Sequence, residues 1–119
     1  MASGKRILVL DDDTSVLEAV ERVLKAQGFD VEVFDTVRFL GGARLGDASC
    51  LVLDINLNGV SGIELKHRLT RFGVSIPVIF ITGADDEATR QAALQTGCAA
   101  FLHKPFPSSA LIEAIEKIG

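Results

Sequence analysis

Acidic, hydroxyl and amine side chains follow four short apolar runs in this sequence. They are Asp11, Asp12 and Asp13 after the first of these runs, Asp54 after the second, Thr82 after the third and Lys104 just after the fourth. Carboxylates that meet at one point repel one another, and Mg²⁺ or Mn²⁺ would relieve that repulsion through oxygen ligands. An aspartate beside such a cation could accept a phosphoryl group, with a lysine and a threonine contacting the phosphoryl oxygens.

Each member of this set also has a simpler interpretation. An aspartate after a strand often caps the following helix, and we expect Asp13 or Thr14 to do so. Asp54, Thr82 and Lys104 are each compatible with an ordinary turn or loop. The set as a whole favours a site, because its members follow successive apolar runs at the same ends.

The elements that must position these residues alternate along the chain. Apolar runs predict five strands, at residues 6–10, 31–34, 50–53, 78–81 and 99–102. Apolar residues at helical spacing predict five helices, near residues 16–27, 37–45, 65–72, 85–96 and 111–118. This alternation predicts an α/β fold in which a doubly wound, five-stranded parallel sheet carries helices on both faces.

The strand order that suits this pattern is 2-1-3-4-5. Residues 31–34 alternate apolar and polar, which is typical of an edge strand, whereas 50–53 and 78–81 are wholly apolar and central. Ligands bind beyond the carboxyl ends of such strands, where the polar residues gather. Asp35 also follows a strand, but the edge position places it far from the centre. Helix 85–96 offers mainly alanines (Ala88, Ala92 and Ala93) to the core and should be the most easily displaced.

From about Lys5 to Ile118 the sequence resembles a response-regulator receiver domain. The resemblance rests on four segments: ILVLDDD at 7–13, LDINLNGVSG at 53–62, FITG at 80–83 and FLHKPF at 101–106. It implies one receiver domain over residues 1–119, regulatory rather than enzymatic, that assists its own phosphotransfer and dephosphorylation. Asp54 would accept the phosphoryl group from a histidine kinase or a histidine phosphotransfer protein.

The resemblance also implies a metal site at the phosphoacceptor. Asp12 would bind Mg²⁺ or Mn²⁺ directly, and Asp11 would bind it through water. Asp54 and the backbone carbonyl of Asn56 would complete the protein ligands. Lys104 would pair with the bound phosphoryl group, and the Lys-Pro peptide bond that it begins is often cis in this family.

A conformational switch is the third implication of the resemblance. Thr82 would move to contact the phosphoryl group, and Phe101 would turn inward into the space that it leaves. This local charge change would shift the fourth helix. The surface formed by the fourth helix, fifth strand and fifth helix would then control a downstream protein, with the domain a monomer or a phosphorylation-dependent homodimer.

Three positions depart from the family pattern. Asn58 stands where the family most often has proline, which predicts a looser loop after Asp54. Gly83 stands where alanine is commoner and could add mobility beside Thr82. Phe101 replaces the more usual tyrosine and so lacks a hydroxyl. These departures affect the switch and its kinetics rather than the phosphoryl transfer.

The composition of the chain limits where the protein is expected to be located and which partners it is expected to bind. The chain has 119 residues and a net charge of −4, which argues against nucleic-acid binding by this domain. No apolar run approaches the roughly 18 residues of a membrane span, and no secretory signal is present. We therefore expect a cytoplasmic protein with no membrane contact. Cys50 and Cys98 are expected to be reduced.

Other functions fit parts of the sequence. The chain could be the excised receiver of a LuxR-type transcriptional regulator, which the segment 54–62 and the Lys-Pro-Phe segment resemble, or a stand-alone or relay protein. A small phosphatase of the haloacid dehalogenase type would use Asp11 as its nucleophile, since residues 10–15 imitate that motif. That interpretation leaves Asp54 unexplained, and the chain is short for the usual cap. A binding domain that never accepts phosphate is disfavoured by the intact set of site residues.

Overall fold

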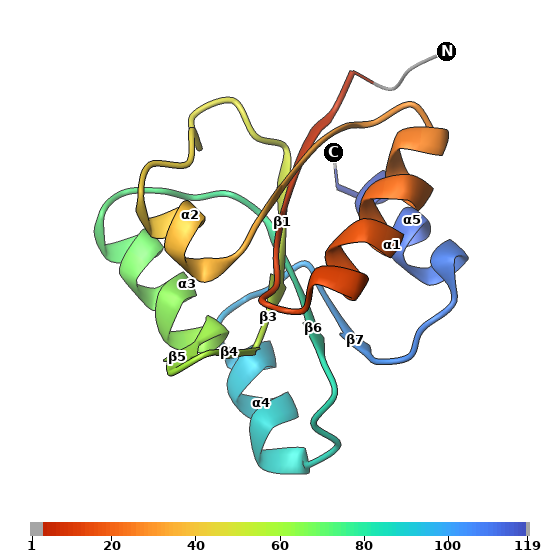
Figure 1. The fold of residues 1–119 in the computed structure, drawn as a ribbon. Helices are drawn as coiled ribbons and strands as arrows, with labels where there is room; N and C mark the ends of the chain where they lie inside the picture. The colour runs from red at the N-terminus through yellow and green to blue at the C-terminus, as the bar shows by residue number, and fades with distance from the viewer. Residues whose placement is uncertain (1–3, 119) are drawn as a thin grey trace.

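The computed structural model describes residues 4–118, which form a parallel sheet between two layers of helices (Figure 1). The strands of the sheet are β1 (Arg6–Leu10), β2 (Asp30–Phe34), β3 (Cys50–Asp54), β6 (Val78–Thr82) and β7 (Ala100–His103). The helices are α1 (Thr14–Ala26), α2 (Thr36–Leu40), α3 (Gly62–Arg71), α4 (Glu87–Gln95) and α5 (Ser108–Glu116). The strand order β2-β1-β3-β6-β7 confirms the predicted topology, with β6 and β7 as the fourth and fifth predicted strands.

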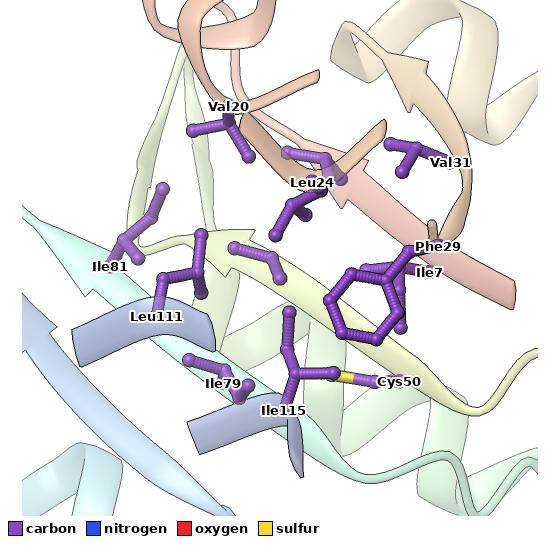
Figure 2. Close-up of a cluster of buried hydrophobic side chains, with 12 residues drawn as sticks. Ile7, Val20, Leu24, Phe29, Val31, Cys50, Ile79, Ile81, Leu111 and Ile115 are labelled. Carbon is purple, nitrogen blue, oxygen red and sulfur yellow. The ribbon is translucent and has the colours of Figure 1, made fainter. Parts of the chain in front are cut away.

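Two apolar cores lie on opposite faces of the sheet, because alternate side chains of a strand point to opposite faces. Ile7 and Val9 of β1 point to the core that α1 and α5 cover, where Figure 2 shows Leu24 and Leu111. Leu8 of β1 points to the other core, which α2, α3 and α4 cover. Burial of each such aliphatic side chain contributes about 1.5–3 kcal/mol to folding. The packing on both faces therefore fixes the position of the strands and of the residues at their ends.

Asp13 caps α1, as one of the two predicted candidates. Its Oδ1 accepts hydrogen bonds from the backbone nitrogens of Ser15 at 3.0 Å and Val16 at 3.4 Å. A bond from the Ser15 hydroxyl at 2.7 Å, together with these backbone bonds, lowers the pKa of the Asp13 carboxyl. Asp13 is therefore used in starting the helix that follows β1.

Two helix ends differ from the prediction. The second helix was expected over residues 37–45, but α2 ends at Leu40, because two glycines follow and Gly42 has a φ of +134°. Phe72 was predicted as the last apolar residue of the third helix. It instead caps the end of α3 with 82% of its surface exposed, because the chain turns at Gly73 with a φ of +80°.

The fourth helix has a still smaller inner face than predicted. Of its three inward alanines, Ala93 alone is buried, while Ala92 is half-buried and Ala88 is exposed. Lys66 of α3 ties the end of this helix, since its Nζ donates to the Thr96 carbonyl oxygen at 2.8 Å. Little apolar area therefore holds α4 against the sheet.

A short hairpin that the sequence analysis did not predict follows β3. It consists of β4 (Asn56–Leu57) and β5 (Val60–Ser61), joined by Asn58 and Gly59. Gly59 has a φ of +72°, whereas the φ of Asn58 is negative, which is the sign pattern of a type II turn. No helix within residues 4–118 is long and apolar enough to cross a lipid bilayer.

Candidate functional site

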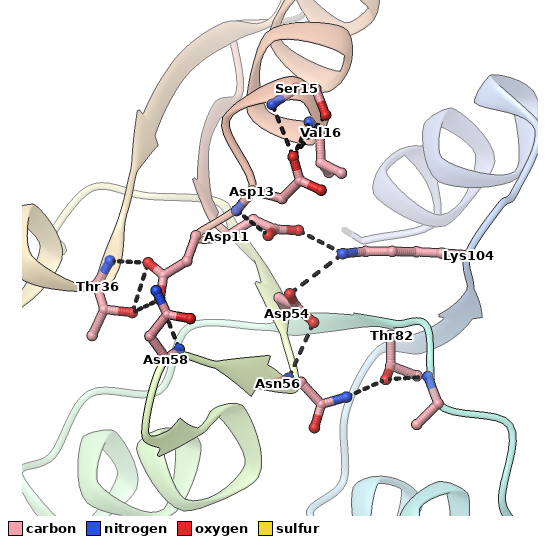
Figure 3. Close-up of polar contacts among 12 residues, drawn as sticks. Asp11, Asp13, Ser15, Val16, Thr36, Asp54, Asn56, Asn58, Thr82 and Lys104 are labelled. Atoms are coloured by element: carbon pink, nitrogen blue, oxygen red, sulfur yellow. Dashed lines mark hydrogen bonds and ion pairs between the residues drawn. The ribbon is translucent and has the colours of Figure 1, made fainter.

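The predicted site residues lie together at the carboxyl ends of the central strands (Figure 3). Asp54 ends β3, Thr82 ends β6, and Asp11 and Lys104 directly follow β1 and β7. An open pocket of about 370 Å³ lies over this rim of the sheet. It is lined by Asp11, Asp12, Asp13, Asp54, Asn56, Asn58, Gly83 and Lys104.

Lys104 lies between two buried carboxylates. Its Nζ donates to Asp11 Oδ2 at 2.8 Å and to Asp54 Oδ2 at 3.3 Å. Burial alone would lower the pKa of Lys104, but its bonds and attraction to Asp11 and Asp54 outweigh burial and raise the pKa. One ammonium group thus offsets only one of the two neighbouring negative charges.

Asp54 is the more weakly compensated carboxylate. Burial and then the charge of Asp11 raise its pKa, against the opposing effects of the Asn56 amide and Lys104. Its Oδ1 accepts from the Asn56 backbone nitrogen at 3.1 Å, and its side chain is 8% exposed. A basic carboxylate at the surface of a pocket, beside an ammonium group, is suited to attack an electrophile such as phosphorus.

Asp11 has both of its carboxylate oxygens engaged. Oδ2 accepts from Lys104, and Oδ1 accepts from the Asp13 backbone nitrogen at 2.9 Å. The side chain is 1% exposed. This arrangement favours Asp54 over Asp11 as the nucleophile.

Asp12 is held by another part of the chain. Its carboxylate accepts hydrogen bonds from the backbone nitrogens of Thr36 at 2.7 Å and Asn58 at 2.8 Å, and from the Thr36 hydroxyl. Burial acts to raise the pKa of Asp12, but these bonds outweigh it and lower the pKa. Thr36 was not predicted as a site residue, although it follows a strand at the same rim, because an edge strand was expected to lie far from the centre of the sheet.

The residues present fit a hard divalent cation in their chemistry, since the carboxylates of Asp11, Asp12 and Asp54 and the Asn56 carbonyl all offer oxygen. As they lie in this structure, however, these oxygens do not converge on one point. Within residues 4–118, no three histidine, cysteine or acidic side chains are grouped closely enough to hold a metal ion. Lys104 and the donors to Asp12 already contact some of the oxygens that a cation would use.

Thr82 lies buried beside the pocket. Its Oγ1 accepts hydrogen bonds from Asn56 Nδ2 at 3.2 Å and from the Ala84 backbone nitrogen at 3.0 Å. These bonds leave the hydroxyl hydrogen of Thr82 for an incoming oxygen. The contact with the Asn56 side chain was not predicted, because the family resemblance implied a role only for the backbone carbonyl of Asn56.

Phe101 of β7 is half-buried and packs against the core that α2, α3 and α4 cover. With Ala84 and His103 it also lines a separate hollow of about 390 Å³ beside the start of α4. Lys104 and Pro105 are joined by a cis peptide bond, as the resemblance implied.

Comparison with known proteins identifies the relatives of this chain. The sequence model described as response regulator receiver domain matches residues 7–116. Response regulator protein TodT of Pseudomonas putida is 36% identical over 110 residues, which cover 92% of this chain and 48% of TodT. Transcriptional regulatory protein FixJ of Azorhizobium caulinodans is 35% identical over 116 residues, which cover 97% of this chain and 55% of FixJ. The chain therefore spans about half the length of the curated relatives it matches.

Solved structures show the same fold. The response regulator StyR superposes with a TM-score of 0.87 and 41% identity, covering 98% of this chain and 59% of StyR. A CheY-like receiver domain protein from Methanospirillum hungatei superposes with a TM-score of 0.81 and 26% identity, covering 97% of this chain and 93% of that protein.

Proposed function

Because the chain belongs to the family of response-regulator receiver domains, which act in two-component signalling, we propose that Asp54 accepts a phosphoryl group. Receiver domains work with histidine kinases and downstream effectors, and the proposed donor is a histidine kinase or a histidine phosphotransfer protein. The observation that carries this proposal is the position of Asp54. Its carboxylate borders the pocket and shares Lys104 with a second buried carboxylate.

The proposed reaction is an in-line displacement at phosphorus. A carboxylate oxygen of Asp54 attacks the phosphorus atom of a phosphohistidine, and a phosphorus–oxygen bond forms as the phosphorus–nitrogen bond breaks. The imidazole leaves with its electron pair and takes up a proton. Lys104, 3.3 Å from Asp54 Oδ2, offsets the negative charge that the phosphoryl group brings.

A divalent cation belongs to this proposal. The family generally binds Mg²⁺ at the phosphorylation site, and Asp11, Asp12, Asp54 and the Asn56 carbonyl would hold Mg²⁺ or Mn²⁺ here. When bound, the cation supplies positive charge beside the phosphoryl oxygens.

The proposed output depends on Thr82 and Phe101. Thr82 moves toward a phosphoryl oxygen and donates to it the hydroxyl hydrogen that the bonds from Asn56 and Ala84 leave available. Phe101 turns into the space that Thr82 leaves, and α4 shifts because it has little buried area. The surface formed by α4, β7 and α5 then controls a downstream protein, either from a monomer or from a phosphorylation-dependent homodimer.

The name of one relative indicates which kind of protein such a domain can control. FixJ is named a transcriptional regulatory protein, and about half of it lies outside the matched segment. The proposed role of this domain in such a regulator is to receive the phosphoryl group, without contacting nucleic acid or membrane itself. The net charge of −4 supports the absence of a nucleic-acid contact by this domain.

The test is phosphorylation with acetyl phosphate and Mg²⁺, measured as intact mass. We expect the wild type and Asp30→Asn, a control at an exposed aspartate of β2, to gain the mass of one phosphoryl group. Asp54→Asn should gain none, and chelation of Mg²⁺ should abolish the gain in the wild type. An adduct of the same yield in Asp54→Asn would contradict the assignment of Asp54.

A further inference from the structure

The carboxylate of Asp12 has donors on both of its oxygens. Oδ1 accepts from the Thr36 backbone nitrogen at 2.7 Å and the Thr36 hydroxyl at 3.0 Å. Oδ2 accepts from the same hydroxyl at 2.9 Å and from the Asn58 backbone nitrogen at 2.8 Å. An ionised carboxylate offers about four lone-pair positions, and three donor hydrogens, one of them shared between both oxygens, occupy most of them.

These donors come from two segments outside the central strands. Thr36 is the first residue of α2, and its backbone nitrogen is one of those that a helix start leaves without a partner in the helix. Asn58 lies in the turn between β4 and β5. Figure 3 shows Thr36 and Asn58 on one side of the site and Lys104 on the other. Asp12 therefore joins the site to α2 and to this turn.

We propose that Thr36 and the Asn58 backbone amide compete with the divalent cation for Asp12, so that metal binding releases α2 and the β4–β5 turn from the site. This inference rests on the proposed function, because it concerns the cation that the proposed function places at the same site. Without a cation, the donors compensate the charge of Asp12, which lines the same pocket as two carboxylates that share one ammonium group. With a cation, the oxygens of Asp12 are needed as ligands, and these hydrogen bonds are lost.

Competition of this kind has a reciprocal consequence. A change that weakens the hydrogen bonds of Thr36 or Asn58 to Asp12 only in the metal-free state must tighten metal binding. A structural role for the same bonds predicts the opposite, since loss of a group that orients a ligand weakens metal binding. The sign of the change in Mg²⁺ affinity therefore separates the two roles.

The first variant is Thr36→Val, which removes the hydroxyl donor and keeps the shape of the side chain. We expect Mg²⁺ to bind roughly ten- to a hundredfold more tightly than to the wild type, since one hydrogen bond to a charged group is lost only from the metal-free state. Thr36→Ser restores a hydroxyl and should bind Mg²⁺ as the wild type does. Thr70→Val is the matched control, because the exposed Thr70 hydroxyl donates to the Lys66 carbonyl oxygen of α3, outside the site.

The second variant is Asn58→Pro, which removes the backbone donor. Its position in the turn accepts proline, because the first central residue of a type II turn has a negative φ. Asn58→Ala is the matched control, since it keeps the backbone N–H and loses only the side chain. We expect Asn58→Pro to bind Mg²⁺ more tightly than Asn58→Ala does.

Mg²⁺ affinity is measured by calorimetry and by the amide signals of Thr36 and Asn58 in NMR spectra, with no phosphodonor present. In the wild type, both signals should shift as Mg²⁺ is added. Equal or weaker binding by Thr36→Val and Asn58→Pro than by their controls would overturn the competition. In that case, the proposed function would still hold if wild-type Asp54 takes up a phosphoryl group. If Asp54 takes up none, the proposed function is overturned on separate grounds.

Discussion

Asp54 is the proposed phosphoacceptor, and its buried carboxylate also lowers the stability of the folded state. Its carboxylate is buried next to Asp11, and the two share the ammonium group of Lys104. A group that must react needs a position where its charge is incompletely compensated, and such positions destabilise the fold. The residue that carries the proposed chemistry should therefore limit stability at neutral pH.

We predict that Asp54→Asn raises the free energy of unfolding at pH 7 by roughly 0.5–2 kcal/mol. Burial and the charge of Asp11 raise the pKa of Asp54 in the folded protein. A carboxyl group of this kind holds its proton longer in the folded than in the unfolded state, so its contribution to stability falls as the pH rises. The gain from Asp54→Asn should thus shrink as the pH is lowered toward about 4, where the unfolded-state carboxyl becomes protonated.

Urea unfolding followed by circular dichroism measures this difference across the pH range. Asp30→Asn is the control, because Asp30 is exposed at the start of β2 and should show no gain. A variant Asp54→Asn that is less stable than the wild type at pH 7 would contradict the prediction.

At the scale of elements, the hairpin and α3 set the position of Asp54. The Gly62 backbone nitrogen donates to the Ile55 carbonyl oxygen at 2.7 Å, which brings the start of α3 against the end of β3. A Cβ atom at Gly62 would overlap the Asp54 carbonyl oxygen and lie 2.9 Å from the Ile55 Cα. The contacting atoms belong to the backbone of a central strand, so they cannot move aside cheaply.

We predict that Gly62→Ala lowers the free energy of unfolding by about 1–3 kcal/mol, as overpacking of a close contact does. It should also slow the uptake of phosphoryl from acetyl phosphate, because the backbone of Asp54 must shift. Gly46→Ala is the control, since a Cβ at Gly46 meets nothing within 4 Å. Equal stability and equal phosphorylation rates in the two variants would show that α3 can withdraw from β3 without cost.

At the scale of the whole molecule, the sequence predicted the strand order and the rim where the site lies. It could do so because a strand buried on one face alternates apolar and polar residues, as at 31–34, whereas a strand buried on both faces is wholly apolar, as at 50–53. The contact between Thr36 and Asp12 could not be predicted in this way. The two residues are 24 positions apart in the sequence, and their contact depends on how β2 pairs with β1. The exposure of Phe72 was not predicted, because the spacing of apolar residues does not show where the chain leaves the helix and turns into solvent.

The central position of β3 makes Cys50 a reporter of global unfolding. Cys50 is 0% exposed, and burial raises the pKa of its thiol to about 12, so the folded protein offers neither access nor thiolate. Cys98 is half-buried, and burial also raises its pKa. We predict that in Cys98→Ser, a thiol reagent at pH 8 labels Cys50 only through global unfolding, at a rate proportional to the unfolded fraction.

This reporter connects the site to the whole fold. A cation that binds only the folded state reduces the unfolded fraction, so Mg²⁺ at about ten times its dissociation constant should slow Cys50 labelling by about tenfold. Asp12→Ala in the same Cys98→Ser background should remove most of that slowing, because it takes away a proposed ligand. If Mg²⁺ slows labelling equally with and without Asp12, then Asp12 is not a metal ligand, and the cation stabilises the fold through other groups.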